Sequence, residues 1–340
     1  MRYIGGKTLL IEYIIDTIKE NTNNINSVID IFSGSAAVSN ALKSEGYRVL
    51  SNDFLYFSYC ISRGTVGISD EPQFNKFNFD VFDYLNNLTI KEASFSLEDC
   101  FIYNNYSPND HCNRMYFRND NAIRIDLIRL TIEKWKNEYL LTEDEYYYLL
   151  AALINAVPYV ANIAGVFGAY LKFWDDRTYK RLKLERPQII VTDKKMTCTN
   201  LDYKEILHEK YDLLYADPPY NSREYLPNYH LLETIARYDR PEIYGVTGMR
   251  GYDGQKSDFC KKTTVRQAFE MLVRDCESKY LLISYNNEGL ISTNDLTEIC
   301  QEYAVGESFK LKEIDYRRYK SKISNNKPDL KEQLYFLRRH

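Results

Sequence analysis

The chain has 340 residues, of which 44% are hydrophobic, so it is long enough for one large domain with an insertion or for two domains. Its seven cysteines form no C-x-x-C pair and its four histidines show no paired spacing, so the sequence predicts neither a disulfide framework nor a metal site. No apolar segment approaches the roughly 18 residues of a spanning helix. We therefore expect a cytoplasmic protein without a signal peptide or a membrane partner.

The net charge of −4 argues mildly against a nucleic-acid partner, because phosphate binding needs a concentration of Lys and Arg. The distribution of charge is more favourable to such a partner. From Lys310 to the C-terminus there are ten Lys and Arg against four acids, and residues 172–195 contain a second basic cluster interrupted by acids. Runs of this kind are more often solvated faces than DNA contacts, so they permit a DNA partner without indicating one.

The first predicted elements form a strand–loop–helix–strand unit. A helical pattern over residues 8–18 precedes an apolar run at 28–32, which predicts a buried strand. Small residues at 33–37 then lead into a second helix. A second strand over 47–52 ends at Asp53, which places an acid at its tip.

The alternation of strands and helices stops over residues 65–185, where helical patterns at 123–136 and 143–156 indicate a largely helical insert. It resumes with predicted strands at 188–192, 212–216, 280–285, 309–319 and 333–338, and helices at 229–238 and 293–303. The sequence therefore predicts an α/β fold with a doubly wound, mixed seven-stranded sheet and helices on both faces. The domain predicted from residues 1–64 and 186–340 is interrupted by the insert at 65–185.

The strongest chemical signal is the sequence Asp-Pro-Pro-Tyr at residues 217–220, at the carboxyl end of an apolar strand. An aromatic amine is a poor nucleophile because its lone pair is delocalised, and the Asp217 carboxylate and Pro218 carbonyl are acceptors that can hold its NH2. Pro218 and Pro219 stiffen the backbone, and Tyr220 can stack on a base flipped out of a duplex. For the tetrapeptide alone, a proline-stiffened turn is an equally good interpretation.

A second signal is the turn at residues 30–35, Asp-Ile-Phe-Ser-Gly-Ser, whose small residues let a ligand approach the backbone. Together with Asp53, at a position where an acid can accept from both ribose hydroxyls, it indicates an adenosine-containing cofactor. Asp53 has an alternative interpretation as a helix N-cap or turn residue. A P-loop at Gly6-Lys7-Thr8 is excluded, because the required earlier glycine would fall at Met1 and no strand precedes it.

These motifs, in this order, resemble those of the Dam-like, alpha-group N6-adenine DNA methyltransferases, which depend on S-adenosylmethionine and include enzymes of restriction–modification systems. Residues 2–7 resemble the N-terminal cofactor motif, and residues 217–220 match the catalytic motif unchanged. Residues 30–35 match the motif D-x-F-x-G-x-G, except that Ser35 stands where a second glycine is usual. Residues 161–172 resemble the segment that the family places near the DNA and the active site, although a glycine-kinked helix packed in the core is an equally good interpretation of any single residue in it.

The resemblance implies a Rossmann-like class I methyltransferase fold in which the insert is the target-recognition domain. It implies a catalytic set of Asp217, Pro218, Pro219 and Tyr220. It also implies that S-adenosylmethionine is bound by Tyr3, Lys7, Asp30, Phe32, Ser33, Gly34, Ser35, Asp53, Asp202 and Tyr203, with residues 200–203 at the position that reads the cofactor's adenine. No metal is expected.

The expected function is site-specific methylation of N6 of a flipped adenine in double-stranded DNA, by a monomer that acts with a cognate restriction endonuclease or alone. Another planar amine, such as RNA adenine, cytosine N4 or a glutamine amide, is the alternative. Cytosine enzymes usually carry serine in place of Asp217 and glutamine enzymes asparagine, so Asp217 favours adenine. A catalytically silent DNA-binding module is disfavoured because every catalytic position holds a competent residue.

Overall fold

The structure is a computed structural model that describes residues 5–93, 95–315 and 330–339. Tyr3, residues 316–319 of the predicted strand at 309–319, and residues 320–329 of the basic run that begins at Lys310 therefore lie outside the described residues. None of the described helices is long and apolar enough to cross a membrane.

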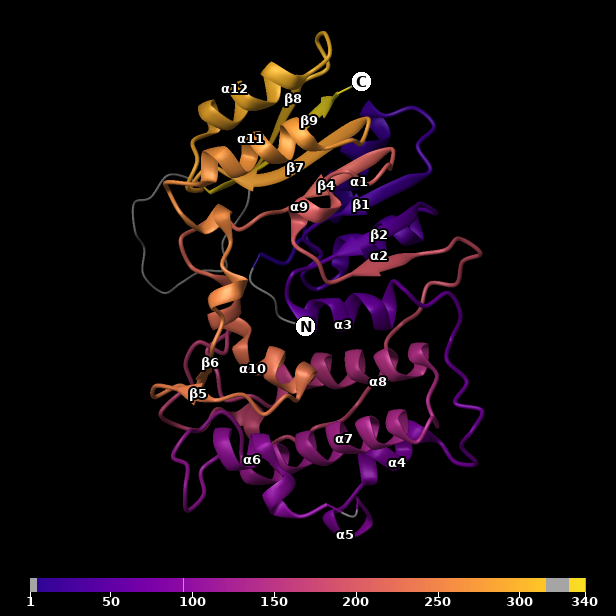
Figure 1. The fold of residues 1–340 in the computed structure, drawn as a ribbon, viewed down its shortest axis with the longest axis vertical. Coiled ribbons are helices and arrows are strands. Elements are labelled where there is room, and N and C mark those ends of the chain that lie inside the picture. The colour runs from indigo at the N-terminus through magenta and orange to yellow at the C-terminus, as the bar shows by residue number, and fades with distance from the viewer. Residues whose placement is uncertain (1–4, 94, 316–329, 340) are drawn as a thin grey trace.

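The described residues form one mixed seven-stranded sheet, as the sequence predicts (Figure 1). Its order is β3-β2-β1-β4-β7-β9-β8. The first five of these strands run parallel, and β9 runs antiparallel to both β7 and β8. The strands are β1 (Ser27–Asp30), β2 (Arg48–Asn52), β3 (Thr197–Thr199), β4 (Leu213–Ala216), β7 (Tyr280–Asn286), β8 (Lys310–Asp315) and β9 (Lys331–Arg338).

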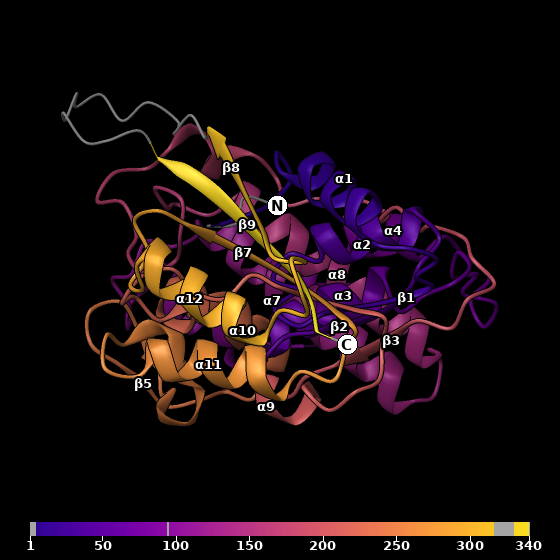
Figure 2. The same cartoon turned by 90° about the horizontal axis from the view of Figure 1, so that it is seen from above.

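Helices cover both faces of the sheet because its central strands are apolar on both sides. Val28 of β1 belongs to one apolar cluster and its neighbour Ile29 to the other. Figure 2 shows α1 and α2 on one side of the strands and α11 and α12 on the other. The first face carries α1 (Ile11–Asn21), α2 (Ala37–Ser44) and α3 (Tyr56–Thr65), and the second carries α9 (Tyr203–Ile206), α11 (Val265–Asp275) and α12 (Thr293–Tyr303).

A helical layer packs beneath α3 and joins the same apolar cluster as the first face of the sheet (Figure 1). Its helix α8 begins where Thr142 and Glu145 form a capping box. After β4 the chain returns to this layer through α10, which contacts both α3 and α8. The layer contains α4 (Val81–Asn87), α5 (Ile90–Ala93), α6 (Phe101–Tyr106), α7 (Asn119–Asn137), α8 (Glu143–Ala156), α10 (Tyr225–Arg237) and the hairpin β5 (Ile243–Tyr244) and β6 (Met249–Arg250).

Short 3-10 turns connect several of these elements. They are η1 (Leu97–Asp99), η2 (Val157–Tyr159), η3 (Asp176–Tyr179), η4 (Asp253–Gln255) and η5 (Asp258–Cys260).

The predicted strand over residues 188–192 is wrong, and the sheet instead takes β3 as its edge strand. The run is apolar and β-branched, but it lies outside the sheet, with Val191 71% exposed. The edge of β2 is occupied by β3, in which Cys198 pairs with Ser51. The predicted helix at 229–238 begins earlier, at Tyr225, because Pro227 falls in the first turn, where proline is tolerated.

Candidate active site

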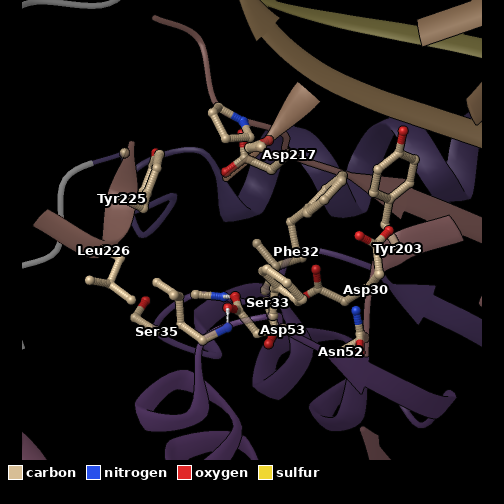
Figure 3. A pocket seen from close by; sticks show the side chains of 18 of the residues that line it. Asp30, Phe32, Ser33, Ser35, Asn52, Asp53, Tyr203, Asp217, Tyr225 and Leu226 are labelled. Carbon is tan, nitrogen blue, oxygen red and sulfur yellow. Dashed lines mark hydrogen bonds between the residues drawn. The ribbon is translucent and has the colours of Figure 1, made fainter. Parts of the chain in front are cut away.

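A pocket opens at the carboxyl ends of the parallel strands, where open α/β sheets bind their ligands (Figure 3). It contains about 1070 Å³ of space, part of it open to solvent. Eleven of the predicted site residues line it: Lys7, Asp30, Phe32, Ser33, Gly34, Ser35, Asp53, Asp202, Tyr203, Asp217 and Pro219. Pro218 and Tyr220 do not line it.

Hydrogen bonds to the last residue of β2 and to Asp53 fix the turn that follows β1. Gly34 has a φ of 51°, a left-handed conformation that favours glycine. Its backbone N–H donates to Oδ2 of Asp53 at 2.7 Å, and the N–H of Ser33 donates to the carbonyl of Asn52 at 2.8 Å. The turn therefore keeps its shape with Ser35 in place of the usual second glycine.

Asp53 accepts hydrogen bonds that stabilise two turns, and it also lines the pocket. Its Oδ1 accepts from the N–H of Leu55 at 2.9 Å, a local turn bond, while its Oδ2 holds Gly34. Burial raises the pKa of Asp53 to about 6, although these two N–H groups favour the charged form. It is not a helix N-cap, because that position of α3 belongs to Leu55.

Asp30 brings an unsatisfied acceptor to the pocket. Its Oδ2 accepts from the hydroxyl of Ser39 at 2.6 Å, whereas Oδ1 has no hydrogen-bond partner among the described residues. The side chain is 1% exposed, and burial raises its pKa to about 7, with a further contribution from the charge of Asp217. A buried, unpaired carboxylate oxygen suits a ligand that brings a cation or a hydrogen-bond donor.

Asn52 joins the tips of three strands at the base of the pocket. Its Nδ2 donates to the carbonyls of Ile31 and Leu201, each at 3.1 Å. Its Oδ1 accepts from the hydroxyl of Thr199 at 2.9 Å and from the N–H of Leu201 at 3.1 Å. The amide is thus fully used for structure.

An aromatic cluster borders the pocket beside Asp202. The ring centroid of Phe32 lies 5.6 Å from that of Tyr203 and 5.5 Å from that of Phe259. Asp202 is the N-cap of α9, and its side chain accepts from the N–H of Lys204. Phe259 has no local sequence signal and was not predicted.

The Asp-Pro-Pro-Tyr turn places Asp217 in the pocket, across from Asp53 (Figure 3). Oδ1 of Asp217 lies 3.1 Å from Nζ of Lys7 and accepts from the hydroxyl of Tyr220 at 2.6 Å. The Lys7 ammonium lies 4.6 Å from the ring centroid of Tyr220, which is 4.9 Å from the ring centroid of Tyr285. Burial raises the pKa of Asp217, and the charge of Lys7 opposes the shift. In this structure the phenol of Tyr220 therefore orients Asp217.

Part of the pocket lining comes from residues that sequence reasoning missed. Tyr225 and Leu226, at the start of α10, line it together with residues 255–258. Two contacts fix that second segment: the N–H of Ser257 donates to Glu224 at 3.0 Å, and Lys204 pairs with Asp258 at 2.6 Å. These residues are brought in by tertiary packing, and no local motif marks them.

The segment over residues 161–172 is a loop against the start of α10. Asn162 is fully buried, and its side chain bonds the backbone of Leu171 and Asp175. The N–H of Phe167 donates to the carbonyl of Asn228 at 2.8 Å. The loop thus contacts Asn228, which follows the pocket residue Leu226 by two positions. The side chain of Asn162 holds the two ends of the loop together.

Comparisons with known proteins give matches over most of the chain. A family model described as D12 class N6 adenine-specific DNA methyltransferase matches residues 3–299. Type II methyltransferase M.FokI of Planomicrobium okeanokoites is 42% identical over 342 residues, which cover 100% of this chain and 53% of that protein. Modification methylase StsI of Streptococcus sanguinis is 38% identical over 345 residues, covering 100% and 52%. Type II methyltransferase M.NlaIII of Neisseria lactamica is 34% identical over 331 residues, covering 96% and 95%. The chain spans about half the length of the first two relatives and nearly all of the third.

Proposed function

The chain belongs to the D12 class N6 adenine-specific DNA methyltransferase family, and on this premise we propose that it methylates N6 of adenine at a specific site in double-stranded DNA. One observation carries the proposal: the glycine turn of residues 33–35 and the Asp217 carboxylate line the same pocket. A cofactor site and an acceptor for an aromatic amine are thereby adjacent.

The residues of the pocket fit S-adenosylmethionine, the methyl donor that methyltransferases of this kind generally use. When bound, it supplies an electrophilic methyl group on a sulfonium. The unpaired Oδ1 of Asp30 suits a cationic group, and the aromatic cluster around Phe32 and Tyr203 suits a flat adenine. Asp53 is the proposed acceptor for the ribose hydroxyls, and Lys7 and Ser35 also line the pocket. The role of Tyr3 is carried by the family resemblance alone.

Asp217 is the proposed acceptor for the target amine. Lys7 and Tyr220 both contact its Oδ1, which fixes the carboxylate before substrate binds. Asp217 then orients the NH2 group, and after methyl transfer the carboxylate or water accepts the proton released by the methylated nitrogen. Pro218 and Pro219 stiffen the turn. The alternative, a different planar amine such as RNA adenine or cytosine N4, is an outcome of the experiment below.

DNA is proposed to cross the surface beside the loop of residues 161–172. Directly after this loop, residues 172–183 contain five Lys and Arg against two acids. Phe173 and Tyr179 are 67% and 62% exposed there, and the guanidinium of Arg118 lies 4.5 Å from the Tyr179 ring centroid. Cations and exposed rings together suit phosphates and unstacked bases. We propose accordingly that the insert over residues 65–185 is the target-recognition unit.

Methylation-sensitive sequencing of DNA from cells that express the chain tests the proposal, with Asp217→Ala as the matched control. We expect N6-methyladenine at one sequence motif, absent in the control. Methylcytosine at a motif would establish cytosine N4 as the target. Unmodified DNA together with methylated RNA would identify RNA as the substrate. The same DNA, challenged with restriction endonucleases that recognise the motif, tests protection. Light scattering of the purified chain tests the proposed monomer.

A further inference from the structure

A second buried carboxylate lies behind the Asp-Pro-Pro-Tyr turn. Glu332 is the second residue of β9 and is 6% exposed. Because β9 runs antiparallel to β7, with Glu332 opposite Asn286, its first residues lie at the edge where the parallel strands end. The fold therefore brings a residue more than 100 positions away in sequence to the proposed catalytic acid.

Glu332 shares both partners of Asp217. Its Oε2 lies 3.7 Å from Nζ of Lys7 and 3.3 Å from the hydroxyl of Tyr220, the two groups that contact Oδ1 of Asp217. Asp217 lines the pocket, whereas Glu332 does not. Glu332 therefore acts on the reaction indirectly, through Lys7, Tyr220 and the effect of its charge on Asp217.

The charges of this cluster explain what a second acid contributes. A lone ammonium 3.1 Å from Asp217 would neutralise the carboxylate and weaken it as an acceptor for the target amine. Burial raises the pKa of Glu332 as it does that of Asp217, and when both acids are ionised the buried cluster of two acids and one lysine carries a net negative charge. That charge favours the positive charge that develops on the amine nitrogen as it is methylated.

We propose that Glu332 is a positioning residue that shares the Lys7 charge and the Tyr220 hydroxyl, and thereby keeps Asp217 an effective acceptor. This inference rests on the proposed methyl transfer. It assigns a function to the C-terminal strand, which brings no recognised motif to the site.

Other charged or titratable groups also face this cluster. Asp30 of β1, Tyr215 of β4 and Tyr225 of α10 interact electrostatically with Asp217, and Tyr215 also interacts with Glu332. Lys7 itself directly contacts Asp217, Tyr220 and Glu332. A change at Glu332 therefore acts on Asp217 chiefly through Lys7, Tyr220 and the direct repulsion between the two acids.

The test compares Glu332→Gln with Glu332→Asp, and uses Glu313→Gln as the matched control. Glu313 is a partly exposed acid on β8, paired with Lys331 at 2.8 Å and outside the pocket lining. Single-turnover methylation with tritiated S-adenosylmethionine is measured from pH 5 to 9 on unmethylated plasmid DNA that carries the motif found by sequencing. Circular dichroism checks that each variant is folded.

We expect Glu332→Gln to lower the plateau rate about tenfold and to shift the acid limb about one unit to lower pH. The shift is downward because loss of the Glu332 charge leaves Lys7 to favour ionised Asp217. Glu332→Asp should recover most of the rate, and Glu313→Gln should match the wild type. An unchanged profile, or a lower plateau with an unmoved acid limb, would overturn the proposal.

A second readout does not depend on methylation. Carbon-13 NMR of aspartate carboxyl groups in the cofactor-free protein, assigned with Asp217→Asn, gives the titration midpoint of Asp217. Glu332→Gln should lower that midpoint, and an unmoved midpoint would overturn the inference even if the plateau rate fell. If wild-type protein methylates no DNA, the proposed function fails on that result, while the NMR titration still decides whether Glu332 controls Asp217.

Discussion

The N–H of Gly34 donates to Oδ2 of Asp53 at 2.7 Å, so the acid that ends β2 holds the glycine turn that follows β1. The other oxygen of Asp53 holds the N–H of Leu55. A single carboxylate thus fixes the backbone of two loops that line the pocket. Cofactor binding and loop geometry are expected to fail together when it is removed.

Asp53→Ala should weaken binding of S-adenosylmethionine tenfold or more, because hydrogen bonds to a charged group contribute roughly 1.5–3 kcal/mol. Asp53→Asn keeps one acceptor oxygen and should lose less affinity than the alanine variant. Titration calorimetry with S-adenosylmethionine measures both. DNA affinity, measured by fluorescence anisotropy, should stay within about twofold of the wild type. Unchanged cofactor affinity in Asp53→Ala would remove this residue from the site.

Asp30 gives a stability prediction whose sign follows from its raised pKa. Its pKa is about 7 in the folded chain, against roughly 3.9 when unfolded, so the unfolded state ionises first as pH rises. The free energy of unfolding therefore decreases between about pH 4 and pH 7 on account of this group. Asp30→Asn removes this loss. The Tm of the cofactor-free variant, relative to wild type, should be several degrees higher at pH 8 than at pH 5. A pH-independent difference in the thermal melts would contradict the burial of the Asp30 carboxyl group with its Oδ1 unpaired.

Local patterns predicted those parts of the site that are contiguous in sequence. The turn of residues 30–35 and the acid Asp53 lie on consecutive strands, and the proline pair at 218–219 marks its own strand end, so each can be recognised without knowledge of packing. Other parts of the site come from elements that are distant in sequence. Tyr225 and residues 255–258 reach the pocket, and Glu332 reaches the neighbourhood of Asp217, only through tertiary packing. No local periodicity encodes such packing.

The wrong strand at residues 188–192 has a related cause. Its β-branched residues fit a pleated strand, but whether a run joins the sheet depends on which segment pairs with β2. The short β3, with its polar threonines, takes that edge. Asn162 shows the same limit, since its burial as a loop-closing amide follows from the positions of Leu171 and Asp175.

DNA affinity should fall steeply with salt despite the net charge of −4, because local Lys and Arg would neutralise phosphates. Lys172→Ala, at the exposed end of the loop of residues 161–172, and Lys180→Ala, at an exposed position after it, should each reduce the slope of log K against log salt by about 1. Lys210→Ala is the control. This exposed lysine precedes the amino-terminal end of β4, whereas the pocket lies at the carboxyl ends of the parallel strands. Equal slopes in all three variants would place the DNA elsewhere.

The final prediction concerns Asp217 and Tyr220. Asp217→Ala should abolish methyl transfer while cofactor and DNA still bind, since the amine loses its acceptor. Asp217→Asn should be severely impaired, because an amide is a weaker acceptor and can present a donor to the NH2. The hydroxyl of Tyr220 donates to Asp217 at 2.6 Å, so Tyr220→Phe should lower the transfer rate about tenfold.

Tyr220→Ala separates orientation of Asp217 from stacking on the target base. If the phenol acts only on Asp217, the alanine and phenylalanine variants should be equally slow; if the ring also turns out to stack, the alanine variant should lose a further tenfold or more. Single-turnover assays with tritiated S-adenosylmethionine measure all four variants, and 2-aminopurine fluorescence at the target position reports the flipped base. Near wild-type transfer by Asp217→Ala would reduce the Asp-Pro-Pro-Tyr sequence to a rigid turn, and full activity of Tyr220→Phe would show that its bond to Asp217 does not serve the reaction.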